Sequence, residues 1–474
     1  MITASNKIVL LTGSCMLIAA TALAAYFSQP LLLAAPIGLL LALHLLQHPR
    51  TLFYLLLFSI PWSAEAHFTE SLGTDLPDEP LMLLMAFNAL VLLLYQRQKK
   101  RVHTKLPLLL LLLLLQVVWI LVTVFLSSHF ILSAKYFLAK GWYLLAFVAA
   151  PLLLVQDEKF IKRSAVVMLC SMGLLTLIIV VRHLDYNFSF SGINDAVRPF
   201  FRNHVTYSAL LVFMVPLQIA FLQTSTNKKL KRVLLACLVI TVAALYLSYA
   251  RGAWIALLGG AVAYWLLKKQ LLFKSFIAVV LLAVIGVFWL KNNDRYLAFA
   301  HDYKTTIFHQ DFEEHLAATY QMKDLSTAER FYRWIAGVRM AQDSWQTGFG
   351  PSTFYEHYKS YTVPAFKTWV SKNEERSTVH NYFLLLLAEQ GAAGLLLFLS
   401  LLGAMFWKVQ KIYSSTGSAF WKNVACAIGA ILVMQCILNS LSDLIETDKV
   451  GSIFYLCVAV LVIADRATRM RNTN

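Results

Sequence analysis

Charged residues are scarce in this sequence. They make up 14% of its 474 residues, against about 25% in a typical soluble domain. Hydrophobic residues reach 59%, and the mean hydropathy is +0.64, which excludes a soluble globular enzyme. Apolar runs such as residues 106–126 are long enough to cross a bilayer, which takes about 20 residues in a helix. Because these runs are continuous and do not alternate, they favour transmembrane helices over a transmembrane barrel.

Metal-binding and redox signatures are also missing. The cysteines lie in apolar segments, and no pair has the spacing of metal ligands, which favours free, buried thiols. They are Cys15, Cys170, Cys237, Cys426, Cys436 and Cys457. An Asp-x-Asp motif in a predicted outer loop, a P-loop and a nucleotide fingerprint are all absent. The sequence therefore predicts no metal and no cofactor, so that arginines would have to hold any diphosphate.

Acidic residues are outnumbered, with 25 against 41 basic residues and a formal net charge of +16. An excess of this size is compatible with nucleic-acid binding. The basic residues, however, cluster in short loops between apolar runs, as the cytoplasmic loops of membrane proteins do. The distribution indicates a topology signal in a membrane-lipid environment and argues against a nucleic-acid partner.

The apolar runs predict an all-α polytopic membrane protein with 12–14 transmembrane helices, an even number. The candidates lie at roughly 8–27, 30–47, 51–62, 80–96, 106–127, 135–155, 163–182, 205–223, 232–249, 252–267, 271–290, 380–407, 420–442 and 449–465. The run at 51–62 is short, and one such pair is compatible with a re-entrant or interfacial element. The first run resembles a signal peptide but has no cleavage site followed by a soluble domain, so we interpret it as a retained span.

The basic loops set the orientation of these spans. They contain Arg97, Lys99, Lys100, Arg101, Lys105, Lys228, Lys229, Lys231, Arg232, Lys268, Lys269, Lys274, Arg466, Arg469 and Arg471. Alternation of the spans places all of them, and both termini, in the cytoplasm. Residues 65–79 (rich in acids and free of Lys and Arg), 183–204, 250–252 and 292–379 then fall outside. We divide the chain into N-terminal spans (1–291), an outer loop domain (292–379) and C-terminal spans with a short tail (380–474).

Arginines on the predicted outer side are the first candidates for chemistry. Arg251 sits at a tight turn between two apolar runs, with Gly252 beside it, so its side chain must face protein or a cavity. Arg330 lies in the outer loop, and Arg198 and Arg202 lie in another outer segment. The planar guanidinium binds two phosphate oxygens at once. Snorkelling to the interface and ion pairing with loop acids are the structural alternatives.

The loop also carries helix signals. Ser326 and Glu329 have the spacing of a capping box, and Arg330 and Trp334 recur at helical spacing on one face. Gly348, Gly350 and Pro351 are typical of the end of such a helix.

Two titratable residues belong to the run after this loop. His380 follows Ser377 and Thr378, either of which can cap a helix, and a histidine in the first helical turn is held neutral and can act as a general base. A structural role at the interface is the alternative. Glu389 lies within the span and on another face than His380. An intramembrane carboxylate is a functional candidate, but we favour a role in neutralising a buried Arg or Lys.

Three motifs resemble those of the O-antigen ligase and polymerase superfamily. Tyr249-Ala250-Arg251-Gly252-Ala253-Trp254 is similar to its S-R-G-A-W segment. Arg330, Trp334 and Gly348-Phe349-Gly350-Pro351 with Phe354 resemble its R-x-x-x-W…G-x-G-P-x-x-F segment. His380-Asn381-Tyr382-Phe383-Leu384 and Ala388-Glu389-Gln390-Gly391 resemble its H-N-x-x-L…A-E-x-G segment. Ala250 and Gln390 depart from the pattern, where Ser and Leu are usual.

The resemblance implies a metal-independent, inverting glycosyltransferase of the GT-C type in the inner membrane of a Gram-negative bacterium. The donor would be O-antigen on undecaprenyl diphosphate, the acceptor lipid A-core, and the active site would face the periplasm. Residue by residue, it implies catalytic roles for Arg251, Arg330 and His380. It adds substrate-binding roles for Trp334, Gly350 and Asn381 and, more weakly, Arg198 and Arg202, with Glu389 in support.

Other functions remain open at this stage. An O-antigen polymerase shares the donor and the fold. A protein O-oligosaccharyltransferase often carries a sizeable soluble C-terminal region, whereas the polar tail here begins at about Asp465. A transporter of lipid-linked sugars predicts inverted repeats and charges along a central path, and neither is evident.

Overall fold

The computed structural model describes residues 21–22, 35–69, 72–99, 106–155, 157–299, 325–368, 371–373 and 376–473. Most of the first predicted span, and Cys15, lie outside these residues. The described helices are α2 (Ala35–Gln47), α3 (Pro49–Ser59), α4 (Asp78–Lys99), α5 (Leu108–Phe125), α6 (Phe130–Leu144), α7 (Ala150–Leu154), α8 (Glu158–Leu184), α9 (Ile193–Val197), α10 (His204–Thr224), α11 (Lys228–Leu247), α12 (Arg251–Lys268), α13 (Leu272–Lys291), α15 (Leu325–Asp343), α16 (Phe354–His357), α17 (Tyr382–Ser415), α18 (Ala419–Leu441) and α19 (Asp448–Thr473).

Shorter elements complete the described fold. The 3₁₀ turns are η2 (Ile60–Trp62), η4 (Asn292–Phe299), η5 (Tyr358–Tyr361), η6 (Pro364–Phe366) and η7 (Leu444–Glu446), and the π-helical turn η3 (Leu145–Ala149) joins α6 to α7. One antiparallel hairpin, β1 (Ala64–Thr69) with β2 (Leu72–Leu76), lies in the acid-rich segment that was expected to be a plain loop. The fold is therefore mostly helical, with this hairpin as an addition to the predicted all-α class.

Ten helices in the described part of the chain are long and apolar enough to cross a membrane, which confirms a polytopic membrane protein. The helix α12 is not among the ten, although it joins α11 to α13 and packs along α18. The described residues of the predicted runs at 30–47 and 51–62 form α2 and α3, with 13 and 11 residues, and α3 is not long enough to span a bilayer alone. The total of 12–14 stays a prediction.

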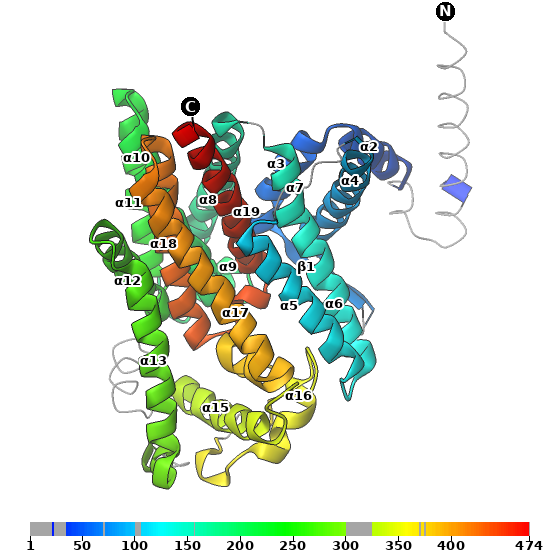
Figure 1. The fold of residues 1–474 in the computed structure, drawn as a ribbon, viewed down its shortest axis with the longest axis vertical. Coiled ribbons are helices and arrows are strands. Elements are labelled where there is room, and N and C mark those ends of the chain that lie inside the picture. The colour runs from blue at the N-terminus through cyan, green and yellow to red at the C-terminus, as the bar shows by residue number, and fades with distance from the viewer. Residues whose placement is uncertain are drawn as a thin grey trace, which may run out of the picture.

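The helices run between two ends of an elongated bundle (Figure 1). One end, which we call the basic end, carries the chain's C-terminus and the starts of α8 and α18. At the other end, which we call the site end, α15 and α16 lie across the bundle (Figure 1). These two helices belong to the described part of residues 292–379, between the last residue of α13 and the start of α17.

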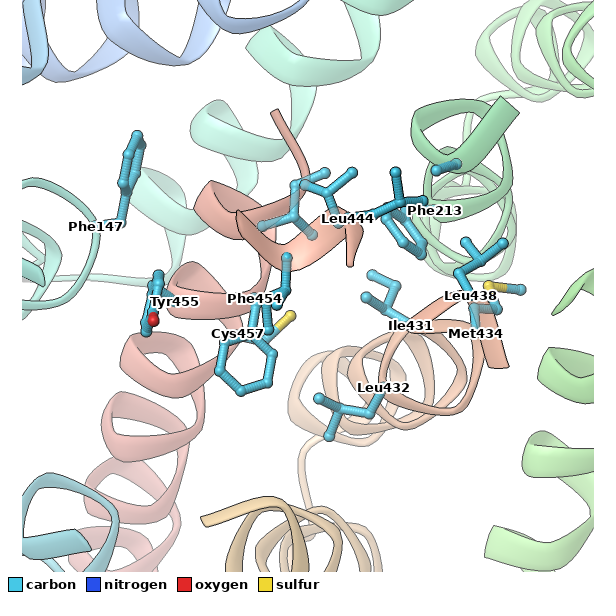
Figure 2. Packing of buried hydrophobic residues seen from close by; sticks show 14 of the residues in the cluster. Phe147, Phe213, Ile431, Leu432, Met434, Leu438, Leu444, Phe454, Tyr455 and Cys457 are labelled. Carbon is cyan, nitrogen blue, oxygen red and sulfur yellow. The ribbon is translucent and has the colours of Figure 1, made fainter. Parts of the chain in front are cut away.

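The core is centred on α18 and α19. Figure 2 shows Phe213 of α10, Ile431 and Leu438 of α18, and Phe454 and Cys457 of α19 packed together, and all five side chains are buried. Such a core is set by shape complementarity, since lipid is as apolar as the helices themselves.

Two glycines in α12 allow it to approach α18 closely. A Cβ atom added at Gly259 would lie 2.3 Å from Ile437, and one at Gly260 would lie 2.2 Å from Met434. Small residues let transmembrane helices pack backbone to backbone. This packing holds the start of α12, and with it Arg251, at the end of α18 where the candidate site lies.

The described cysteines are free, as predicted, but not all are buried. Cys170 and Cys237 are exposed on the protein surface, within α8 and α11. Both helices are candidate spans, so a lipid environment explains why these thiols need no protein partner.

Candidate active site

His380 lies just before α17, outside the helix. Asn381 is the N-cap residue, and its side-chain oxygen accepts a hydrogen bond from the backbone of Leu384 at 3.0 Å. Its amide nitrogen donates to the carbonyl of Ser440, also at 3.0 Å. The expected cap at Ser377 or Thr378 is therefore wrong, because Asn381 supplies a stronger cap one residue before the helix. His380 has a φ of 54°, a left-handed conformation that turns the chain into the helix.

The partner of His380 is Arg333, a residue that the motif comparison did not select. The Nη1 atom of Arg333 lies 2.8 Å from Nε2 of His380 and donates a second, longer bond to the Thr378 carbonyl at 3.3 Å. A guanidinium has no acceptor, so Nε2 must be the acceptor. The proton of the neutral imidazole therefore sits on Nδ1.

Glu329 holds Arg333 from the other side. Its Oε2 atom accepts from Nη2 of Arg333 at 3.1 Å, and the two side chains are only 8% and 7% exposed. Its other oxygen accepts from the hydroxyls of Thr368 and Ser371. The predicted capping box of Ser326 and Glu329 is thus wrong. Helix α15 already begins at Leu325, and the Glu329 carboxylate turns inward because a buried cation binds it more strongly than a backbone amide.

Asp443 faces the opposite edge of the His380 ring. Its Oδ1 atom lies 4.0 Å from Nδ1 of His380, and its carboxylate accepts a hydrogen bond from the side chain of Thr378. Burial raises the pKa of Asp443 above the usual range of a carboxyl group. Sequence reasoning missed this residue. The available signal was an acidic residue in the short connection between two apolar runs.

The segment that carries Asp443 is anchored to α6. Asp443 is the N-cap residue of η7, and Glu446 at the end of this turn accepts from Lys140 at 2.9 Å and from Tyr136 at 3.0 Å. An ion pair with both partners largely buried fixes the position of the turn. The structure therefore joins three distant parts of the chain around His380.

The electrostatic surroundings keep His380 neutral. Burial, together with the guanidinium groups of Arg333 and Arg330, lowers the pKa of His380 from 6.5 to about 3. Neutrality was expected from the positive end of a helix, but the physical cause is desolvation and two arginines. In this arrangement the Nε2 lone pair is occupied by Arg333, so His380 can take a proton only when Arg333 moves away.

Arg330 and Trp334 lie on one face of α15, as their spacing predicts. The indole nitrogen of Trp334 donates to the His380 carbonyl at 3.4 Å. Arg330 is close enough to influence the pKa of the His380 ring. Both residues therefore belong to the surroundings of His380.

Arg251 comes to the same place from a different direction. It is the first residue of α12, after Ala250 at the N-cap position. A Cβ atom on the next residue, Gly252, would lie 3.2 Å from Leu441 at the last turn of α18. Because Asn381 bonds to Ser440 in that turn, the end of α18 links the Arg251 and His380 motifs.

Arg198 and Arg202 are held elsewhere at the site end. Arg202 pairs with Glu65 of β1 at 2.8 Å, and Arg198 lies 3.8 Å from Asp195 of α9. The side chain of Arg198 is 66% exposed and that of Arg202 is 80% exposed, so these ion pairs are weak. The structure ties both arginines to the hairpin and α9, and their predicted role in substrate binding stays a prediction.

Glu389 has a different role from the one we favoured. Its two carboxylate oxygens accept hydrogen bonds from the backbone amides of Ser352 at 2.8 Å and Phe354 at 2.9 Å. It therefore holds the loop after α15 rather than a buried Arg or Lys. An anion can satisfy several buried amides at once, which is why a carboxylate is found at this depth.

Gly350 allows the loop after α15 to approach α17 and the Ser127 segment closely. Its φ is 107°, and an added Cβ atom would lie 2.1 Å from the Ser127 hydroxyl. Its amide donates to the Glu389 carbonyl at 2.9 Å. Gly391 interrupts α17 with a φ of 68°, where its backbone meets Gln346. Gly350 is thus placed as a docking residue for the turn between α15 and α17.

We expect Glu389→Gln to weaken this docking. A neutral amide keeps one acceptor oxygen and adds a donor, so one of the two buried amides loses its partner, at about 1–3 kcal/mol. Thermal unfolding in detergent should show a lower melting temperature. The matched control is Glu356→Gln, which makes the same change at an exposed carboxylate in the same layer. An equal melting temperature for Glu389→Gln and wild type would contradict the docking role.

Among the described residues, no group of three or more His, Cys, Asp and Glu side chains has the arrangement of a metal site. The titratable groups around His380 are instead arginines and single carboxylates. This donor set suits an anionic ligand such as a phosphate.

Comparison with known proteins gives one family. Residues 235–399 match the family model described as O-antigen ligase. No curated protein matches the chain. The matched region contains the Arg251, Arg333 and His380 positions together with Glu389 and ends before Asp443, so the contacts of Asp443 come from the structure alone.

Proposed function

We propose, from the match of residues 235–399 to the O-antigen ligase family model, that this membrane protein is an O-antigen ligase. It would transfer a polysaccharide from undecaprenyl diphosphate to lipid A-core. The family itself implies an enzyme of ligase or polymerase type with a lipid-linked polysaccharide as substrate. The ligase reaction, the identity of both lipids and a GT-C mechanism without a metal belong to the proposal.

The observation that carries the proposal is the line of contacts Arg333–His380–Asp443. A cation that can bind phosphate lies 2.8 Å from an imidazole, and a carboxylate lies 4.0 Å from the other ring nitrogen. Arg330 and Arg251 belong to the same end of the bundle. Cations beside a base are what a sugar transfer from a diphosphate requires, because the leaving group gains negative charge as the acceptor hydroxyl loses its proton.

The reaction balances with these groups. The acceptor oxygen forms a bond to the anomeric carbon on the face opposite the diphosphate, which inverts that centre. The bond between the anomeric carbon and the phosphate oxygen breaks, and its electron pair stays on the diphosphate. Arg251, Arg330 and Arg333 stabilise that charge. The hydroxyl proton moves to Nε2 of His380, while Nδ1–H turns toward Asp443.

Donor binding would prepare the base. In the structure, Arg333 occupies Nε2 of His380 and also pairs with Glu329. A bound diphosphate competes for Nη1 of Arg333, because an anion attracts the guanidinium more than a neutral imidazole does. Loss of this bond exposes the Nε2 lone pair and raises the pKa of His380. The acceptor would then be activated only after the donor is in place.

The proposed location follows from charge. Lys159, Lys228, Lys268 and Arg466 lie at the ends of helices that meet at the basic end, which by the positive-inside rule is cytoplasmic. His380 lies at the opposite end and would face the periplasm of a Gram-negative cell. Both termini would be cytoplasmic.

The decisive experiment is reconstitution of the purified protein with lipid A-core and a lipid-linked polysaccharide, with EDTA present and no membrane gradient. A ligase forms lipid A-core carrying the polysaccharide. A polymerase instead lengthens the chain on its lipid, and a transporter forms no product. Formation of the ligated product only with an added divalent metal would contradict the metal-independent mechanism.

Asp443 is a positioning residue for His380, and Asp443→Asn tests this role. Because burial raises the pKa of Asp443, its protonation should contribute, together with that of His380, to the loss of transfer at acidic pH. We expect Asp443→Asn to lower kcat by about 10²-fold or more and to shift the acidic limb of the pH profile, because the contribution of Asp443 to that limb is lost, with KM for the donor little changed. A variant that keeps the wild-type pH profile would show that Asp443 has only a structural role. Asp465→Asn, toward the opposite end of α19, is a control for loss of a partly buried carboxylate, one that pairs with Lys408.

A further inference from the structure

A cavity opens at the basic end of the bundle, far along α18 from His380. It encloses about 150 Å³ and lies between α3, α8, α10, α18 and α19. Its residues on α18 run from Phe420 to Ile431, and those on α19 run from Ile453 to Val460. The cavity therefore extends from the basic end toward the middle of the bundle. Ile431 of α18 and Cys457 of α19, both labelled in Figure 2, belong to its lining.

The lining of the cavity is apolar except at its mouth. The polar residues that line it are Lys162, Ser164, Thr224 and Asn423. The hydroxyls of Ser164 and Thr224 already donate to carbonyls in their own helices. A cavity without free polar partners in its depth holds no ordered water and accepts hydrocarbon instead.

The mouth of the cavity is positively charged. Lys162 lines it, with its ammonium group 4.8 Å from the centre of the Phe420 ring, and its side chain is exposed. Other exposed cations of the same helix ends are Arg50, Lys159, Arg163 and Lys422. The acids of this region are Asp157, whose carboxylate caps α8, and Glu158. The cations thus exceed the acids at the point where a lipid headgroup would lie.

We propose that this cavity binds one acyl chain of an anionic phospholipid, with the headgroup phosphate at Lys162. The apolar lining suits the hydrocarbon of an acyl chain, and the cationic mouth suits the headgroup. The site is separate from His380 and does not depend on the proposed transfer reaction.

The test uses the purified, delipidated full-length protein in detergent and native mass spectrometry. The probes are phosphatidylglycerol and phosphatidylcholine with identical palmitoyl and oleoyl chains. We expect phosphatidylglycerol to bind about fivefold more tightly or better, since each Lys or Arg near an anionic lipid contributes about that factor. Lys162→Gln should lower the affinity for phosphatidylglycerol about fivefold and leave the affinity for phosphatidylcholine unchanged. Lys229→Gln, an exposed lysine of the same end but outside the cavity, is the control.

A second variant tests the chain. Ala427→Phe places a ring in the cavity and should reduce the binding of both lipids, while Ala165→Phe, nearer the mouth, serves if the first variant does not fold. Three results overturn the proposal: equal affinity for the two phospholipids, equal losses in Lys162→Gln and Lys229→Gln, or displacement of phosphatidylglycerol by undecaprenyl phosphate at equal concentration. Unchanged binding in the folded Phe variants would also overturn it.

Discussion

Replacing His380 by alanine is expected to lower the rate of polysaccharide transfer by about 10²–10⁴-fold, the range over which general bases contribute. The imidazole is the group that lies between Arg333 and Asp443, and nothing else in this arrangement can take the acceptor proton in the same position. Rates should be measured with saturating donor and acceptor in the reconstituted system. The control is His357→Ala, a histidine of the same layer whose Nε2 lies 2.8 Å from the Ser128 hydroxyl. A near wild-type rate for His380→Ala would sink the base role.

The same residue has a stability signature. In the unfolded chain an imidazole titrates near pH 6.5, whereas the folded pKa of His380 is about 3. Between these values the unfolded state binds the extra proton, so the free energy of unfolding rises with pH. The stability that this difference in the pKa of His380 contributes is present in full above pH 6.5 and is lost as the pH falls toward 3. In His380→Ala this part of the pH dependence of thermal unfolding should disappear.

Arg333→Met is expected to destabilise the fold by about 3–5 kcal/mol, because it leaves the buried carboxylate of Glu329 without its cation. Both side chains are nearly inaccessible, so solvent cannot compensate. The double variant Glu329→Gln/Arg333→Met should recover most of the loss, since a neutral amide can still accept from Thr368 and Ser371. Thermal or denaturant unfolding of the four proteins completes the cycle.

Activity and stability should separate in this cycle. The double variant is expected to fold but not to transfer, because the guanidinium beside His380 is missing. Arg339→Met is the control, since Arg339 belongs to the same helix but bonds to Tyr296 at 3.4 Å. If the double variant were no more stable than Arg333→Met alone, the two residues would not act as a buried pair.

Local patterns predicted much of this molecule. Hydropathy located most spans to within a few residues, because burial in lipid depends on composition over about 20 consecutive residues. The spacing of Arg330 and Trp334 predicted a shared face, and their helix is present. The motif that contains His380 was also placed correctly at the entrance of a span. These features depend on neighbours in the chain.

The errors have a common cause. Glu329 was assigned to a cap and Glu389 to a buried cation, yet the first binds Arg333 and the second binds the backbone of the turn after α15. In each case several local partners were compatible with the sequence. The partner that each carboxylate binds is set by the packing of a distant segment, and the spacing of residues in the sequence does not specify that packing.

The sequence by itself determined that this chain is a helical membrane protein, and its resemblance to a known family predicted that Arg251, Arg330 and His380 act together. Only the tertiary structure decided which cation meets the histidine. Arg330 and Arg333 are one helical turn apart on α15, and either can be turned toward a residue almost 50 positions later. The packing of α15 on α17 directs Arg333 to Nε2, 47 residues away, and the end of α18 brings Asp443 to the other ring nitrogen. Contacts between segments so far apart depend on how the helices pack, and no local pattern specifies that.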